Sequence, residues 1–113
     1  MMKLPGVYIA GVWQHGPQAL TVINPSNEQQ LAEVAGGDGA AVERATQAAR
    51  AAFAGWSSST GAERATVLRT IAEGVEARRE RLVFLQASNN GKPLAEAQMD
   101  VDDVIATFGY YAE

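Results

Sequence analysis

The sequence predicts a mixed α/β fold in which short strands come first and helices fill the rest of the chain. Residues 7–14 and 20–23 are rich in β-branched and aromatic types, as in strands, whereas apolar residues after residue 38 recur at three- and four-residue steps, as in amphipathic helices. The chain has 113 residues, of which 47% are apolar and 19% are charged. This balance is typical of a globular chain and not of a disordered one.

The strands are predicted from short β-rich segments that are bounded by turn residues. Gly11 marks a turn or bulge within the first segment, Asn24 and Pro25 end the second, and Gly36 begins the glycine-rich stretch that ends the third. We therefore expect strands at about residues 7–14, 20–23 and 30–35.

Four helices are predicted from their apolar periodicity and their capping residues. Asp38 is a plausible N-cap for the first helix, and Thr60 with Glu63 matches a capping box for the second. Gly91 can adopt the left-handed conformation that closes a helix, and Pro93 suits the first turn of the last one. The expected helices cover about residues 39–54, 61–78, 79–89 and 93–112.

The apolar faces of these helices predict their buried sides. On the first helix this face comprises Val42, Ala45, Ala49, Ala52 and Phe53. On the last helix it comprises Leu94, Ala97, Val101, Val104, Ile105, Phe108 and Tyr111.

The last helix also carries a polar stripe that includes two aspartates, Asp100 and Asp103, spaced i and i+3. The spacing alone favours a solvated helix face, and the alternative is a carboxylate pair that binds a cation. Asp102 falls off this stripe. The stripe consists of Glu96, Asp100, Asp103, Thr107 and Tyr110.

Composition argues against several classes of protein. The net charge of −4, without a block of like charges, argues against a nucleic acid or an anionic membrane as partner. With no cysteine and a single histidine, His15, neither a Cys–His pair nor a multi-histidine metal cluster can form. The chain has neither a dinucleotide-binding glycine fingerprint nor a P-loop. The first residues lack the apolar centre of a signal peptide, so a cytoplasmic location is expected by default.

Several segments occur in the order found at the start of aldehyde dehydrogenases, and the chain resembles the N-terminal part of that family. No single segment is specific, but together they extend over almost the whole chain. They are Tyr8–Trp13, Ile23–Asn27, Ala45–Trp56, Glu63–Arg64, Leu68–Ala72, Asn90–Ala97 and Tyr110–Ala112.

The segment Asp100–Val104 resembles the betaine aldehyde and aminoaldehyde dehydrogenase branch, whose members oxidise aldehydes that carry an amino or trimethylammonium group. The resemblance implies that Asp100 and Asp103 line the substrate entrance and bind a small cationic aldehyde, while Asp102 is structural or solvated. It further implies a monovalent cation, K or Na, held by the backbone carbonyl of Ile23 and by Asn89. Asparagine instead of the family's aspartate keeps an oxygen ligand at position 89 but removes its charge.

The resemblance covers only the N-terminal portion of the family's chain, so residues 1–113 are expected to form part of the coenzyme-binding domain region. The resemblance implies that the Rossmann core, the catalytic domain and the catalytic cysteine lie outside these residues. The full-length parent is expected to use NAD or NADP and to be a homo-oligomer, dimer or tetramer, whereas the fragment alone is expected to be inactive because it lacks the thiolate. The alternatives are a stand-alone helical binding module derived from the family and an aldehyde dehydrogenase of another substrate branch.

Overall fold

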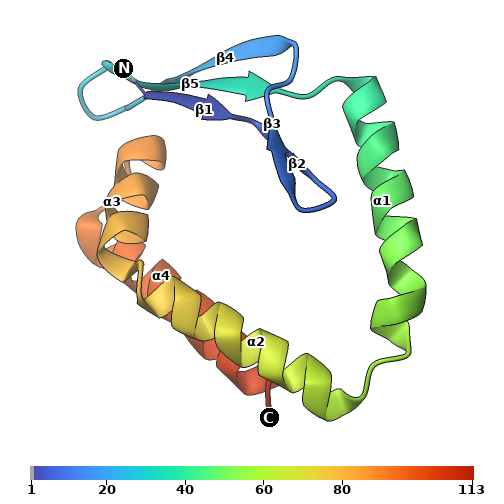
Figure 1. Ribbon diagram of the computed structural model, residues 1–113. Helices are drawn as coiled ribbons and strands as arrows, with labels where there is room; N and C mark the ends of the chain where they lie inside the picture. Colours follow the sequence, from blue (N-terminus) through green and yellow to red (C-terminus); the bar gives the residue numbers. More distant parts are fainter. Residues whose placement is uncertain (1) are drawn as a thin grey trace. The chain divides into compact units, whose positions relative to one another are not determined.

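The computed structural model describes residues 2–113, which form two compact units, residues 2–58 and residues 59–113. The first unit holds five strands and one helix, and the second holds three helices (Figure 1). The predicted α/β class and the order of strands before helices are therefore confirmed. No helix within residues 2–113 is long and apolar enough to cross a membrane.

The larger sheet of the first unit has three strands, with β5 (Gln30–Gly36) in the middle. It pairs in parallel with β1 (Met2–Pro5) and antiparallel with β4 (Gln18–Ile23). Strand β1 was not predicted, because it is four residues long and includes a proline, which is tolerated at a sheet edge but gives no strand signal.

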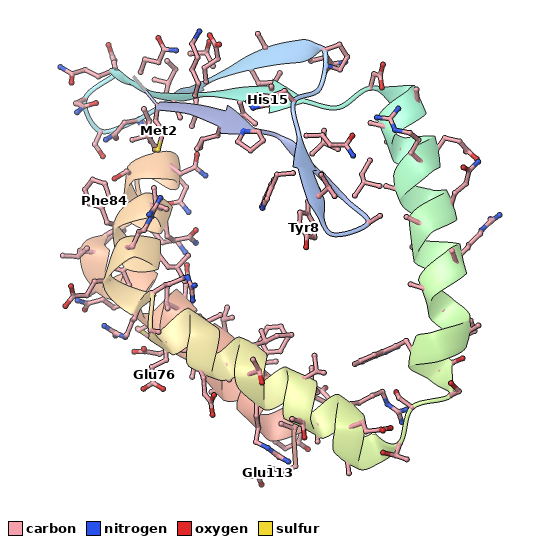
Figure 2. All side chains as sticks on the ribbon, in the orientation of Figure 1. Met2, Tyr8, His15, Glu76, Phe84 and Glu113 are labelled. Carbon is pink, nitrogen blue, oxygen red and sulfur yellow. The ribbon has the colours of Figure 1, made fainter. Side chains whose placement is uncertain are left out.

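The segment predicted as a strand at residues 7–14 is a two-stranded hairpin of β2 (Val7–Ile9) and β3 (Val12–Gln14). Ala10 and Gly11 form its turn with positive φ angles of 51° and 81°, the combination required by a type I′ turn. The amides of Gly6 and Gly16, one at each end of the hairpin, both donate to the carbonyl of Ala35 at 3.1 and 2.9 Å. The hairpin is thereby attached to β5. His15 lies in the exposed link that leads from the hairpin to the larger sheet (Figure 2).

Helix α1 (Gly39–Ser57) begins where predicted, because the Asp38 carboxylate accepts a hydrogen bond from the Ala41 amide at 2.9 Å. Its buried face differs from the predicted one. Ala41, with Ala45 and Ala48, packs on Val7 and Ile9 of the hairpin. The predicted core residues Val42 and Phe53 are instead 66% and 68% exposed, because the helix contacts the hairpin through small residues near its start.

The second unit consists of α2 (Gly61–Glu76), α3 (Arg79–Asn90) and α4 (Leu94–Tyr111), and α4 lies along α2 (Figure 1). The predicted capping box is present, with Thr60 Oγ1 accepting from the Glu63 amide at 3.2 Å and the Glu63 carboxylate accepting from the Thr60 amide at 2.7 Å. Gly91 ends α3 in the left-handed conformation with φ 76°. The core of this unit is formed by Val83, Ala97 and Val101, with Val75, Leu82, Ala87 and Ile105 around them.

Only part of the predicted apolar face of α4 is buried. Ala97 and Val101 are buried and Ile105 is half-buried, as predicted, whereas Leu94, Val104 and Tyr111 are exposed. The buried strip is narrow because α4 packs against the core of this unit mainly through Ala97, Val101 and Ile105. Helices α2 and α4 are also joined at the C-terminal end of α4, where the Arg69 guanidinium of α2 donates to the Ala112 carbonyl at 3.0 Å.

Candidate functional site

The acidic stripe of α4, defined as Glu96, Asp100, Asp103, Thr107 and Tyr110, is the candidate site. Gly91 ends α3 and Pro93 precedes the first residue of α4, so the stripe starts directly after a fixed turn. The side chains of the stripe are exposed apart from Asp100, which is half-buried. The two aspartates are one helical turn apart, as the spacing predicted, but their surroundings differ.

Asp100 is engaged by two neighbouring side chains. Gln86 of α3 donates its Nε2 hydrogen to Asp100 Oδ2 at 2.8 Å, and the Lys92 ammonium contacts the same oxygen. The hydrogen bond from Lys92, followed by the one from Gln86, holds the pKa of Asp100 below its usual value. Asp100 is therefore a carboxylate at neutral pH, and its charge is compensated by Lys92.

Asp103 is exposed and makes no hydrogen bond or ion pair with any other residue in the range 2–113. Its carboxylate is therefore available to a ligand. The structure thus places both predicted site residues on one helix face but leaves only one of them without a partner in the described chain.

Asp102 connects α4 to the start of α3. The Arg79 guanidinium binds it with two hydrogen bonds, Nε to Oδ1 at 2.6 Å and Nη2 to Oδ2 at 2.8 Å. The pair lowers the pKa of the Asp102 carboxyl and raises the pKa of Arg79, mainly through these hydrogen bonds. Bidentate geometry of this kind fixes orientation as well as charge. A structural role for Asp102, one of the two interpretations from the sequence, agrees with this contact.

A groove of about 310 Å³ lies beside Asp100, within the second unit. Its walls are mostly apolar, and Asp100 and Gln86 are its polar residues. It is lined by Val75, Leu82, Gln86, Asp100, Val101 and Val104.

Gln86 and Lys92 were not recognised from the sequence as part of the site. Gln86 is one polar residue on a helix with several others, and Lys92 precedes Asp100 by eight residues across a turn, a separation that no helical or strand periodicity relates. The only available signal was the Gly91-Lys92-Pro93 turn, which could be interpreted as a helix boundary but not as the source of an ion pair.

The two residues expected to bind a monovalent cation lie in different units. Ile23 ends β4 in the first unit, and Asn89 is exposed in the last turn of α3 in the second. Carbonyl oxygens suit hard cations, but two neutral donors fall short of the coordination such ions need. Within residues 2–113, no group of three or more His, Cys, Asp or Glu side chains could hold a metal ion.

The arrangement of short strands followed by helices is also found in a family of oxidoreductases. The family model described as "Aldehyde dehydrogenase family" matches residues 13–113, and the chain belongs to this family. The resemblance noted from the sequence is therefore confirmed.

The similar proteins include enzymes named for aminoaldehydes and for betaine aldehyde. The chain is 40% identical to aminoaldehyde dehydrogenase 2 of Zea mays, over 96% of this chain and 23% of that protein. It is 36% identical to the chloroplastic betaine aldehyde dehydrogenase of Beta vulgaris, over 98% of this chain and 24% of that protein.

The fold is similarly matched by a crystal structure of betaine aldehyde dehydrogenase from Staphylococcus aureus in complex with NAD+. The TM-score is 0.90 at 35% identity, covering 96% of this chain and 22% of that one. The chain thus spans about a quarter of the length of the relatives that it matches.

Proposed function

We propose that this chain is the N-terminal portion of an NAD(P)-dependent aldehyde dehydrogenase that oxidises betaine aldehyde or other amino and trimethylammonio aldehydes to carboxylic acids. Residues 1–113 are proposed to form part of its coenzyme-binding domain region. The names of the Zea mays, Beta vulgaris and Staphylococcus aureus relatives support this substrate class. The observation in the chain itself that supports it is the exposed Asp103 carboxylate, one helical turn from Asp100.

The stripe supplies the type of recognition that a cationic substrate needs. A trimethylammonium group has no hydrogen to donate, so a protein can recognise its charge only through electrostatic attraction and apolar contact. Anionic side chains on one helix face supply the attraction, which strengthens as water is excluded around them. A primary ammonium could in addition donate a hydrogen bond to either carboxylate.

The proposed part of this chain in the reaction is binding and not covalent chemistry. Its 113 residues contain no cysteine, so the thiolate that attacks the aldehyde carbon would come from the rest of the enzyme. We expect no NADH or NADPH formation when the purified 113-residue chain is mixed with betaine aldehyde and either coenzyme. Coenzyme reduction under those conditions would contradict the proposal.

Substitution of Asp103 in the full-length enzyme tests the proposed substrate class. Asp103→Asn should raise KM for betaine aldehyde and leave KM for 3,3-dimethylbutanal, its neutral isostere, nearly unchanged. Asp102→Asn is the matched control, because it removes the same charge from the same helix at a residue that contacts Arg79. Equal increases in KM for both aldehydes in Asp103→Asn would show that Asp103 is structural and would refute the substrate assignment.

The monovalent cation is proposed on the carbonyl of Ile23 and on Asn89, with the remaining ligands from outside residues 1–113. Because Asn89 contributes no charge, binding should be weak, and Asn89→Asp should lower the potassium or sodium concentration needed for half-maximal stability or activity of the full-length enzyme. An unchanged cation dependence in both Asn89→Asp and Asn89→Ala would exclude Asn89 as a ligand.

We further propose that the full-length enzyme is a dimer or tetramer in the cytoplasm. Several large apolar side chains of this chain are exposed, among them Trp13, Phe84 and Met99. Burial of these side chains against other polypeptide, from the same enzyme or from another subunit, supports an oligomer. Some relatives are named as chloroplastic or peroxisomal, so location differs within the family. Sedimentation of the full-length enzyme and imaging of a tagged form would test both statements.

A further inference from the structure

The turn between α3 and α4 presents a lysine to the first aspartate of the acidic stripe. The Lys92 amide donates to Asn90 Oδ1 at 2.9 Å, Gly91 holds the left-handed conformation, and Pro93 restricts the backbone of Lys92, the residue before it. The side chain of Lys92 is only 26% exposed, and its ammonium contacts Asp100 Oδ2. Lys92 is therefore held against Asp100 by an ordered segment of backbone.

This contact makes the two aspartates unequal toward a cation from solution. At Asp100 an incoming ammonium must compete with one that is already attached to the protein, and short tethers give effective concentrations of about millimolar or higher. At Asp103 no side chain of residues 2–113 competes. Counted together, Asp100, Asp103 and Lys92 carry a net charge of −1 and not −2.

We propose that Lys92 is a specificity-determining residue, whose ammonium takes the place of the substrate's cation at Asp100 and leaves Asp103 to bind the substrate. Asp100 is then a positioning residue that holds the Lys92 ammonium away from Asp103. This inference rests on the proposed function, because it assumes that the acidic stripe binds cationic aldehydes. It adds that the preference for such aldehydes is limited by Lys92.

Charge counting gives distinct expectations for single and double variants of the full-length enzyme. Lys92→Met changes the net charge to −2 and should lower KM for betaine aldehyde roughly 2- to 5-fold, the range expected of partly exposed ion pairs. Asp100→Asn frees the lysine, brings the net charge to 0 and should raise KM by a similar factor. The double variant Lys92→Met/Asp100→Asn returns to −1 and should restore KM close to that of the wild type.

A second reading, in which Asp100 itself binds the substrate's cation, makes a different prediction for the double variant. Its KM for betaine aldehyde would stay raised, because the binding carboxylate is gone whether or not Lys92 is present. The double variant therefore separates a positioning role of Asp100 from direct contact.

Lys92→Gln separates charge from packing. Its amide can still donate a hydrogen bond to Asp100, so the turn keeps a partner while the positive charge is lost. It should lower KM for betaine aldehyde as Lys92→Met does, and it serves in place of that variant should Lys92→Met not fold. The matched control is the Arg79→Met/Asp102→Asn cycle, which makes the same charge changes at the Arg79–Asp102 ion pair between α3 and α4. It should not alter the ratio of KM for betaine aldehyde to KM for 3,3-dimethylbutanal.

The experiment measures kcat and KM of each variant for betaine aldehyde and for 3,3-dimethylbutanal. The inference is supported when the Lys92 variants lower KM for the cationic aldehyde alone and the double variant is rescued. It is overturned when the Lys92 variants have no effect or the same effect on both aldehydes, or when rescue fails. Asp103→Asn distinguishes failure of this inference from failure of the proposed function. A rise in KM for betaine aldehyde alone in that variant supports the proposed function even where the role of Lys92 is refuted.

Discussion

Replacing Val101 by alanine tests whether the second unit is held together by the small core between α3 and α4. Val101 is 6% exposed and packs with Val83 and Ala97, which are 5% and 0% exposed. The substitution removes two buried methyl groups, about 1.6 kcal/mol at about 0.8 kcal/mol each, and the cavity raises the loss to about 2–3 kcal/mol. The higher helix propensity of alanine offsets roughly 0.6 kcal/mol of this loss in unfolding free energy.

The matched control is Val104→Ala, which makes the same change one turn later on α4 at a residue that is 42% exposed. The gain in helix propensity is common to both variants, so their difference reports burial. We expect a net loss of about 1.5–2.5 kcal/mol for Val101→Ala and a change within about 0.5 kcal/mol for Val104→Ala.

Amide hydrogen exchange measured by NMR on the 113-residue chain gives a separate value for each unit. Amides of α3 and α4 should exchange about 10 to 70 times faster in Val101→Ala, while amides of α1 keep their rates. Equal effects of Val101→Ala and Val104→Ala would refute the assignment of the core, and acceleration in α1 would show that the effect is not confined to residues 59–113.

Three further predictions concern the turns and caps. Gly91→Ala should destabilise the second unit by about 1 kcal/mol in urea unfolding, because φ of Gly91 is 76°. Gly109→Ala should stabilise the same unit by about 0.5–1 kcal/mol, because Gly109 lies within α4 with open space around it. A more stable Gly91→Ala than Gly109→Ala variant would contradict the assigned cap. Ala10→Asn should stabilise the hairpin, since asparagine tolerates the positive φ of this turn better than alanine, and a fall in the melting temperature would count against the type I′ turn. Hydrogen bonds from Thr60 lower the pKa of Glu63, so the Glu63 carboxylate contributes fully to stability above the unfolded pKa of 4.5, and this contribution is lost as the pH falls through the folded pKa. Glu63→Gln keeps a capping side chain and should remove this part of the acid dependence of unfolding. An unchanged pH profile of unfolding in Glu63→Gln would disprove it.

Local chemistry made most of the secondary structure predictable. The Asp38 cap, the Thr60 capping box and the Gly91 helix end each depend on residues within a few positions of one another, so their sequence signals are direct. Strand β1 and the pairing of β1 with β5 were not predictable in this way, because the partner of Met2 is Ala32, thirty positions away. The buried faces of α1 and α4 were only partly predicted, since apolar periodicity identifies a face but not how much of it a neighbour covers.

In the candidate site, too, features that depend on one helix were predictable from the sequence, whereas contacts between elements were not. The helical spacing of Asp100 and Asp103 could be read from the sequence, since it depends on one helix only. The unequal partners of the two aspartates could not, because Gln86 comes from another helix and Lys92 from the turn before α4. These two contacts depend on how α3 and the turn after it pack against α4, and the periodicity of a single helix does not predict that packing.

The contacts of Asp100 and Asp102 also have a mechanical consequence for α4. The two residues lie roughly 200° apart around the helix axis, so their bonds hold α4 from nearly opposite sides. Their partners Arg79 and Gln86 are seven residues apart and share one face of α3, about two turns from each other. The helix can therefore neither roll about its axis nor slide along α3 without breaking one of these bonds. Asp103 directly follows Asp102 and lies one turn after Asp100, so the side of α4 from which it projects is fixed relative to α3.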